Sequence, residues 1–288
     1  MRILSEHFVE ALKGGALSGI RDVVISDKDL DLQIRDNYIN VYFKGNSLLK
    51  LTESHDKKYK VDIHPKFTGA ETVSDLVDEK STMKFIKRIP ELKENIIRFG
   101  ITSLEVEYEQ LIIRANNNEK RNNSEYFIVD RQYATPGGRF DLTGIYWRRF
   151  PRKKDQEVPL CFMEIKFALN QDIKEVHNQI QRYYNEITKD PEFITEEAES
   201  ILKQKLGLGL FDQDKKRLEA MKTLKISKDI NSYQFILVLV DYNPFSKSLD
   251  LEKLEALPFA KQVKVFYGGF AMWERNLSSY PDLSFGGG

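Results

Sequence analysis

The stretch Leu160-Cys-Phe-Met-Glu-Ile-Lys-Phe167 places two charged side chains inside an otherwise apolar run. Side chains alternate along a strand, so Glu164 and Lys166 are predicted to point to one face, opposite to their apolar neighbours. Burying a carboxylate or an ammonium costs several kcal/mol unless the group is paired or binds a metal. The stretch therefore predicts a buried strand that also carries a chemical site.

The preceding strand, Gly138-Arg-Phe-Asp-Leu-Thr-Gly-Ile-Tyr146, carries an isolated charge at Asp141. Two carboxylates suit a hard divalent cation such as Mg²⁺, with Mn²⁺ as a substitute, and the main-chain carbonyl of Ile165 can supply a further ligand. Such a cation polarises a phosphoryl oxygen, while Lys166 orients or deprotonates the attacking water. We therefore expect Asp141, Glu164 and Lys166 to hydrolyse a phosphodiester.

An acid-x-Lys triplet has little meaning as a pattern, since five others lie in polar helical or loop segments where a solvated charged face explains them. These are Asp56-x-Lys58, Asp78-x-Lys80, Glu91-x-Lys93, Asp172-x-Lys174 and Asp214-x-Lys216. Glu164-Ile-Lys166 differs because it lies in an apolar strand that follows a strand with an isolated Asp. The competing interpretation of the trio is a structural buried ion pair.

Around this stretch the hydrophobic periodicity predicts an α/β (α+β) fold with a mixed central sheet flanked by helices. The expected elements are a helix over 101–116, strands over 126–133, 139–147 and 160–169, a helix over 172–188, and strands over 235–240 and 263–267. The first helix is predicted to present one apolar face, made of Leu104, Tyr108, Leu111, Ile112 and Ala115.

Residues 1–99 are predicted to form a small antiparallel β/helical region before a domain over 100–288. The expected elements are a helix over 2–13, strands over 31–35, 38–43, 47–51 and around 61–63, and helical sequence over 72–98. The region has no chemical motif but is rich in lysine, at Lys44, Lys50, Lys57, Lys58, Lys60 and Lys66. Either it guides substrate or dimerises, giving a homodimer, or it packs against the second domain to complete the fold.

Three ordered motifs together resemble the PD-(D/E)xK nuclease superfamily: Gly138-Arg-Phe-Asp141, Phe162-Met-Glu-Ile-Lys166, and a helix with Gln179-x-x-x-Tyr183. The resemblance covers roughly residues 100–270. It implies a restriction-endonuclease-like core, with Asp141 and Glu164 as metal ligands and Lys166 as the catalytic lysine. The helix is similar to that of RecB-type nucleases, which implies that Gln179 and Tyr183 position substrate. The proline of the family motif is replaced by Phe140.

Family members often add a carboxylate from the first helix, and Glu105, Glu107 and Glu109 compete for that role. Helical spacing places Glu107 in a stripe with Gln110 and Arg114 that borders the apolar face, which favours it over Glu105 as a further metal ligand. The alternative is a surface helix with scattered acids.

Two weaker candidates lie nearby. His177 shares a helical stripe with Gln181 and Tyr184, and either contacts substrate or is a partly exposed structural histidine. The basic loop over 148–154 joins the two strands of the expected site. It either grips phosphates or is a solvated hairpin loop.

The composition bounds the class of protein. Of 288 residues, 41% are hydrophobic, and 44 basic side chains balance 44 acidic ones, which excludes a disordered chain and weighs against non-specific coating of nucleic acid. Its one cysteine, Cys161, allows no internal disulfide and no cysteine-rich zinc site, and its apolar neighbours predict a buried thiol. No apolar run approaches a membrane span, so we expect no membrane partner and a cytoplasmic location.

The leading hypothesis is a Mg²⁺-dependent nuclease that acts on nucleic acid, with DNA as the expected partner. A second hypothesis is a catalytically silent nuclease-like module that binds nucleic acid or a protein. A third is a hydrolase with the same metal chemistry that acts on another phosphate ester. The sequence distinguishes neither DNA from RNA nor endonuclease from exonuclease action.

Overall fold

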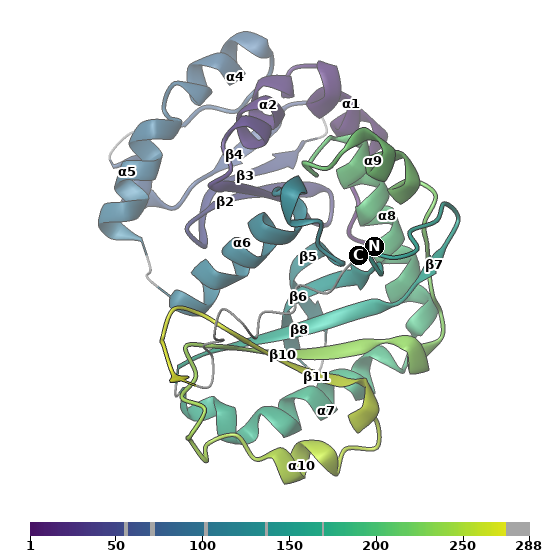
Figure 1. Ribbon diagram of the computed structural model, residues 1–288. Coiled ribbons are helices and arrows are strands. Elements are labelled where there is room, and N and C mark those ends of the chain that lie inside the picture. The colour runs from purple at the N-terminus through teal and green to yellow at the C-terminus, as the bar shows by residue number, and fades with distance from the viewer. Residues whose placement is uncertain (55–56, 70–72, 101–102, 136–137, 169, 275–288) are drawn as a thin grey trace.

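Two lobes, each built on its own sheet, make up the protein (Figure 1). The computed structural model describes residues 1–274 apart from 55–56, 70–72, 101–102, 136–137 and 169. The first lobe holds an antiparallel four-stranded sheet and the second a mixed five-stranded sheet, so the predicted mixed α/β class is confirmed. Within the described residues, no helix has the length and apolarity needed to cross a membrane.

The N-terminal lobe contains the predicted meander, in the order β1-β2-β3-β4. Its strands are β1 (Leu30–Ile34), β2 (Tyr38–Phe43), β3 (Asn46–Glu53) and β4 (Tyr59–Asp62). Its helices are α1 (Glu6–Gly14), α2 (Ser18–Ser26), α3 (Pro65–Thr68), α4 (Glu79–Ile86) and α5 (Ile89–Phe99). Buried apolar residues from these elements form a hydrophobic cluster that Leu208 of the second lobe completes. The boundary at residue 99 stays a prediction.

The helices predicted in this lobe are present with different bounds, and the lobe also contains helices that were not predicted. The first helix begins at Glu6 rather than residue 2, because Ser5 caps it by accepting a hydrogen bond from the Phe8 N–H. Helix α2 lies between the first expected helix and the first expected strand, where no element was predicted. The helical sequence over 72–98, whose first residue lies outside the described ones, is two helices, with Pro90 in the first turn of the second.

The second lobe has the sheet order β11-β10-β8-β6-β5, in which β8, β10 and β11 run parallel and the other neighbours antiparallel. Its strands are β5 (Tyr126–Thr135), β6 (Gly138–Tyr146), β7 (Glu157–Val158), β8 (Leu160–Phe167), β9 (Lys225–Ile226), β10 (Gln234–Val240) and β11 (Val263–Gly268). Its helices are α6 (Leu104–Asn117), α7 (Val176–Ile187), α8 (Pro191–Gly207), α9 (Lys215–Met221) and α10 (Leu251–Glu255), with short 3₁₀ turns η1 (Lys120–Asn122), η2 (Gln171–Glu175), η3 (Ile230–Ser232) and η4 (Ala260–Gln262).

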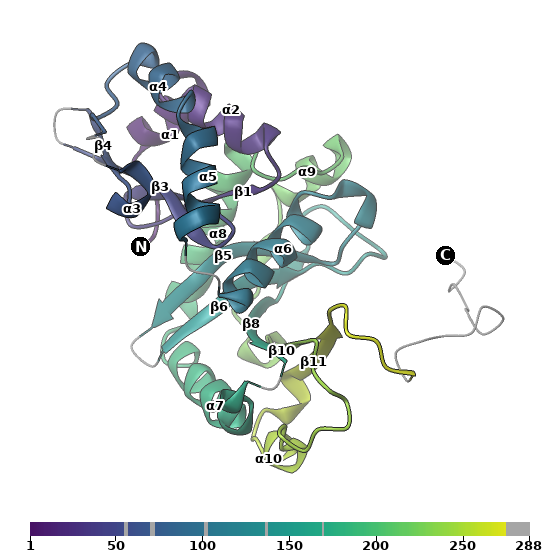
Figure 2. The same ribbon diagram turned by 90° about the vertical axis from the view of Figure 1, so that its left-hand side faces the viewer.

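The five-stranded sheet is covered on both faces. Helices α7 and α10 lie on one side and α6 on the other, toward the N-terminal lobe (Figure 2). Apolar residues of α7 and α8 pack with alternate residues of β6, β8 and β10 in one cluster. The opposite face forms a smaller cluster with Ile113 of α6, in which Cys161 is a buried free thiol as predicted.

The apolar face predicted for α6 is confirmed only at Tyr108 and Ile112, which pack against the smaller cluster. Leu104 and Leu111 are 47% and 44% exposed, and the buried face instead carries Glu109, Gln110, Ile113 and Asn117. Polar groups are buried here because each has a partner in one of the lobes: the Gln110 amide donates to the Asp29 carbonyl, and the Asn117 amide to the Ile128 carbonyl at 2.8 Å. Hydrophobic periodicity indicates only part of the buried surface of a helix that packs through hydrogen bonds.

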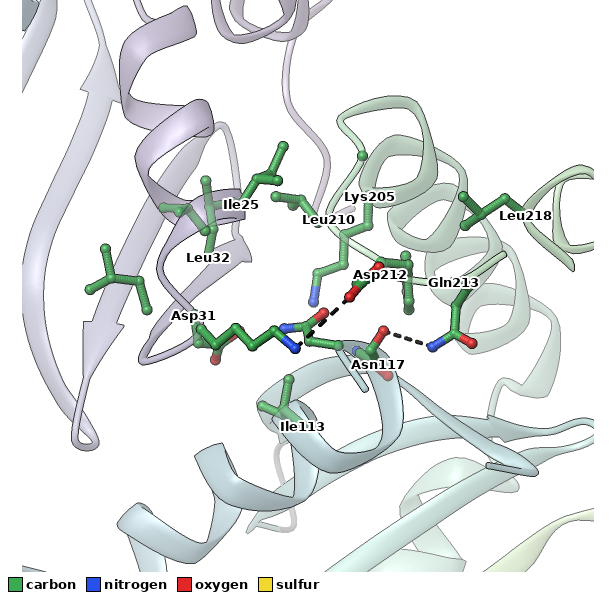
Figure 3. A pocket seen from close by; sticks show the side chains of 16 residues that line it. Ile25, Asp31, Leu32, Ile113, Asn117, Lys205, Leu210, Asp212, Gln213 and Leu218 are labelled. Carbon is green, nitrogen blue, oxygen red and sulfur yellow. Dashed lines mark hydrogen bonds and ion pairs between the residues drawn. The ribbon is translucent and has the colours of Figure 1, made fainter. Parts of the chain in front are cut away.

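Buried charges join the lobes. Asp130 of β5 accepts hydrogen bonds from the guanidinium groups of Arg35 and Arg2, the latter at 2.7 Å. Lys205 of α8 donates to Gln33 Oε1 at 2.7 Å, next to a cavity of about 420 Å³ between the lobes. Figure 3 shows the Lys205 side chain directed toward Asp31 and Asn117 at this cavity. The N-terminal lobe thus packs on the second lobe through a polar interface.

Candidate active site

The predicted site lies where β6 and β8 separate. Hydrogen-bonded pairing of the two strands ends at Leu142 and Met163, and Asp141 and Glu164 are the next residue on each strand. The alternation predicted for β8 is confirmed, since Glu164 reaches α7 while Met163 packs in the cluster on the opposite face. The two carboxylates therefore lie where the two strands begin to separate, a place that we call the fork.

The trio Asp141, Glu164 and Lys166 is brought together by this geometry. Lys166 Nζ donates to Glu164 Oε1 at 2.6 Å, and both residues are buried, at 6% and 4% exposure. The Ile165 N–H, between them in sequence, donates to Asp141 Oδ2 at 2.7 Å and so ties β8 to the start of β6. The ligand role of the Ile165 carbonyl stays a prediction.

Gln179 and Tyr183, one helical turn apart on α7, join the same network. The Gln179 amide donates to Glu164 Oε1 and to the Tyr183 hydroxyl, both at 2.6 Å. The Tyr183 hydroxyl donates to the Arg139 carbonyl at 2.7 Å, which fixes its direction. Helix α7 therefore orients the Glu164 carboxylate, a contact that neither motif predicts by itself.

Gly138 begins β6 directly under Tyr183. Its φ of 146° lies in a region that favours glycine, and a Cβ there would lie 2.6 Å from Tyr183 Cε1. The first residue of the motif Gly138-Arg-Phe-Asp141 is thus explained by the close approach of the α7 tyrosine to the strand.

The electrostatics of the fork disfavour two negative charges. Burial raises the pKa of Asp141 to about 7, and the nearby Glu164 carboxylate adds to the rise. Burial likewise raises the pKa of Glu164, against the opposing effect of the Lys166 ammonium. Burial lowers the pKa of Lys166, but the carboxylate of Glu164 outweighs it and the net shift is upward. Lys166 is therefore held in its charged form.

One oxygen of this site is left without a partner. Glu164 Oε2 is buried and makes no hydrogen bond with the described residues, because the hydroxyl of the nearby Tyr183 donates to the Arg139 carbonyl. A buried carboxylate oxygen without a donor, beside a second carboxylate whose charge is disfavoured, fits a divalent cation, which supplies the missing positive charge. The described residues contain no group of three or more His, Cys, Asp or Glu arranged to hold a metal. Water or main-chain oxygens would complete the shell, as Mg²⁺ permits.

Glu105, rather than the favoured Glu107, is the acid of α6 that lies at the fork. Glu105 Oε1 accepts from the Asn170 amide at 2.8 Å and from the Phe167 N–H at 3.4 Å, at the end of β8. Its charge also contributes to the raised pKa of Asp141, after burial and Glu164. Glu107 instead pairs with Lys44 of the N-terminal lobe at 2.8 Å. The structure thus brings Glu105 to the fork and Glu107 to the N-terminal lobe, and the role of either acid as a metal ligand stays a prediction.

Glu109, the third acid of that helix, is buried against Arg131 Nε. Burial raises its pKa to about 7 even though Arg131 opposes the shift, and the charge of Asp141 contributes to the rise. Glu109 therefore lies between the fork and the charged residues at the lobe interface, because it pairs with Arg131 of β5 and its pKa responds to Asp141 of β6.

The geometry does not bring His177 or the basic loop into this network. His177 lies on α7 close enough to Asp250 to help lower that carboxyl's pKa, behind the larger effect of the Lys253 N–H. The loop over 148–154 follows the far end of β6, about 17 Å of strand beyond Asp141. Its Arg152 packs over the Trp147 ring at 4.9 Å and donates to Asn123, which are structural contacts.

Sequence reasoning missed two residues at the fork. Asn170 holds Glu105, and Gln132 of β5 lies opposite Asp141, since Arg131 pairs with Leu142 and Tyr133 with Phe140 on either side. Gln132 has a left-handed φ of 54°, which is strained for a residue other than glycine. The residue type at position 132 does not indicate this backbone conformation. Asn170 could have been noticed because it closely follows the β8 motif in the sequence.

Comparison with known proteins identifies no relative: no family model, no curated protein and no solved structure matches the chain.

Proposed function

We propose that this protein is a Mg²⁺-dependent nuclease, with Mn²⁺ as a substitute, that hydrolyses a phosphodiester bond of nucleic acid, DNA being the expected substrate. The observation that carries the proposal is the buried Glu164 Oε2, which has no donor among the described residues and lies beside Asp141, whose charge is disfavoured. The ordered motifs that resemble the PD-(D/E)xK superfamily support the same assignment. A cytoplasmic location and a homodimer stay predictions.

Asp141 and Glu164 would hold the cation, and a cation there would supply polarisation of the phosphoryl oxygen and acidification of the attacking water. In the hydrolysis, the water oxygen adds to phosphorus, the bond to the leaving sugar oxygen breaks, and that oxygen takes up the proton that water loses. The products are a phosphate monoester and a hydroxyl end.

The chain's own residues orient these reactants. Because the pKa of Lys166 is raised, its ammonium donates hydrogen bonds to the water or to a phosphate oxygen and does not act as the base. This narrows the role expected from the sequence. Gln179 keeps Glu164 in position through its two hydrogen bonds, and Tyr183 keeps Gln179 in position through the Arg139 carbonyl.

The test is cleavage of single- and double-stranded DNA and RNA with Mg²⁺, Mn²⁺ or EDTA. Lys166→Ala is expected to lower the rate about 1,000-fold or more while the circular dichroism spectrum is unchanged. Lys174→Ala is the matched control, since Asp172-x-Lys174 is the same triplet on an exposed turn. Cleavage that survives EDTA or Lys166→Ala would contradict the proposal, and binding without any cleavage would favour the silent module.

A further inference from the structure

A cleft of about 310 Å³ separates the N-terminal lobe from the start of α6 and from β5. The β2–β3 turn and the α3 segment line one wall, and residues of the second lobe line the other. The lining residues are Gly45, Asn46, Ser47, His64, Lys66 and Phe67 on the first wall, with Ser103, Val106 and Gln132 on the second. Figure 2 shows α3 on the side of its lobe near β5.

The cleft opens next to the candidate active site. Gln132 lies opposite Asp141 in the register of β5 and β6, and its amide reaches Glu109 Oε2 at 3.4 Å. On the same wall, Ser103 precedes the first turn of α6, which carries Glu105 to the end of β8. The second wall of the cleft therefore shares β5 and the first turn of α6 with the fork.

The chemistry of the cleft suits a phosphate backbone. No acid is among the described residues that line it, although the whole chain has as many acidic as basic side chains. Lys66 and His64 are both exposed at its edge. The Lys66 N–H donates to His64 Nδ1 at 3.3 Å, so the neutral ring carries its proton on Nε2, which then donates outward.

We propose that this cleft binds the sugar–phosphate backbone of the nucleic-acid strand next to the scissile phosphate. Lys66 supplies the charge and His64 Nε2 a hydrogen bond. The assignment rests on the proposed nuclease function, because it states where the substrate of that enzyme runs. It gives the N-terminal lobe a role in holding substrate in addition to its packing role.

The test is the affinity for a fluorescein-labelled DNA oligonucleotide, measured by fluorescence anisotropy in EDTA over a series of salt concentrations. Lys66→Ala is expected to weaken binding about tenfold and to reduce the salt slope by about 0.9, the value for one lost phosphate contact. Lys66→Glu should weaken it further, and His64→Ala should weaken it less. Lys80→Ala, on exposed α4 far along the lobe, is the matched control and should bind as the wild type does.

The outcomes separate the two proposals. If Lys66→Ala binds with the affinity and salt slope of Lys80→Ala, or if the wild type binds no oligonucleotide, the cleft assignment is overturned. If binding depends on Lys66 but no metal supports cleavage, the nuclease activity is overturned and the strand site stands. Since Lys66 is exposed, unchanged thermal unfolding of the variants confirms that the lost affinity is not a folding defect.

Discussion

Asp130 and Asp141 lie on neighbouring strands of one sheet, and each belongs to a buried cluster of charges. Asp130 accepts from two guanidinium groups, those of Arg35 and Arg2, and from the Arg131 N–H at 2.7 Å. Asp141 accepts one backbone hydrogen bond and lies near the carboxylates of Glu164 and Glu105, with Lys166 as the cation in the group. The first cluster has an excess of donors and the second an excess of negative charge.

We propose that this difference separates a structural cluster from a functional one. A carboxylate that is surrounded by donors stabilises its interface as long as every partner remains. A carboxylate that is held near others destabilises the fold, and carboxylates perturbed in this way are concentrated at functional sites. The burial of charged residues, by which the sequence singled out β8, does not distinguish the two cases. The number of hydrogen-bond donors around each carboxylate does.

The strongest test of this comparison is the same substitution at both positions. Asp130→Asn leaves the buried guanidinium group of Arg35 and the half-buried one of Arg2 facing a neutral amide, and should lower the free energy of unfolding by about 3–5 kcal/mol. Asp141→Asn keeps an acceptor for the Ile165 N–H and removes a disfavoured charge, so in EDTA it should raise the free energy of unfolding at pH 7.5 and above. Urea unfolding of both variants measures the two effects.

The pH dependence gives the control. A carboxyl whose pKa is raised to about 7 in the folded state makes its full contribution to the free energy of unfolding below the unfolded pKa of 3.8. That contribution is lost as the pH rises through 7. The advantage of Asp141→Asn should therefore grow between pH 4 and pH 7. Equal losses of stability in the two variants would show that both clusters are structural.

The regular parts of the fold followed from the sequence. The meander, the two central strands and the strand over 235–240 each show the alternation or apolar run that buried strands need. The trio at the fork followed as well, because Glu164 and Lys166 interrupt an apolar run and one strand before them carries a lone Asp. These features are local, so the sequence contains them.

The features that the sequence did not reveal depend on contacts between segments that lie far apart in the chain. Helix α6 packs through Glu109 and Gln110 against partners more than twenty residues away, so its hydrophobic pattern indicates only part of its buried surface. That partial pattern favoured Glu107 over Glu105. The left-handed backbone of Gln132 arises only when β5, β6 and α6 are assembled, and no residue type marks it.

A second prediction sharpens the comparison on the structural side. Burial lowers the pKa of Lys205 to about 8, although Asp31 and Asp130 oppose the shift. Between that value and the unfolded value of 10.5 the unfolded chain binds more protons, so stability should rise with pH there, with a slope of up to about 1.4 kcal/mol per pH unit. Lys205→Met should remove the rise. Urea unfolding of wild type and variant between pH 8 and pH 10 measures it, and an unchanged slope would assign the rise to other groups.

The smallest effect is expected where the lobes meet in solvent. Lys44 and Glu107 bridge them at 2.8 Å, but the side chains are 51% and 35% exposed, and exposed pairs contribute at most about 1 kcal/mol. Glu107→Gln should therefore change stability by less than that and leave Mg²⁺-dependent cleavage unaltered. Glu105→Gln, which alters the carboxylate at the fork, should slow cleavage about 10- to 100-fold, as loss of an outer partner of a metal site does. The cleavage rates of the two variants show which of the two acids serves the site. Slow cleavage by Glu107→Gln together with normal cleavage by Glu105→Gln would favour Glu107, as the sequence did.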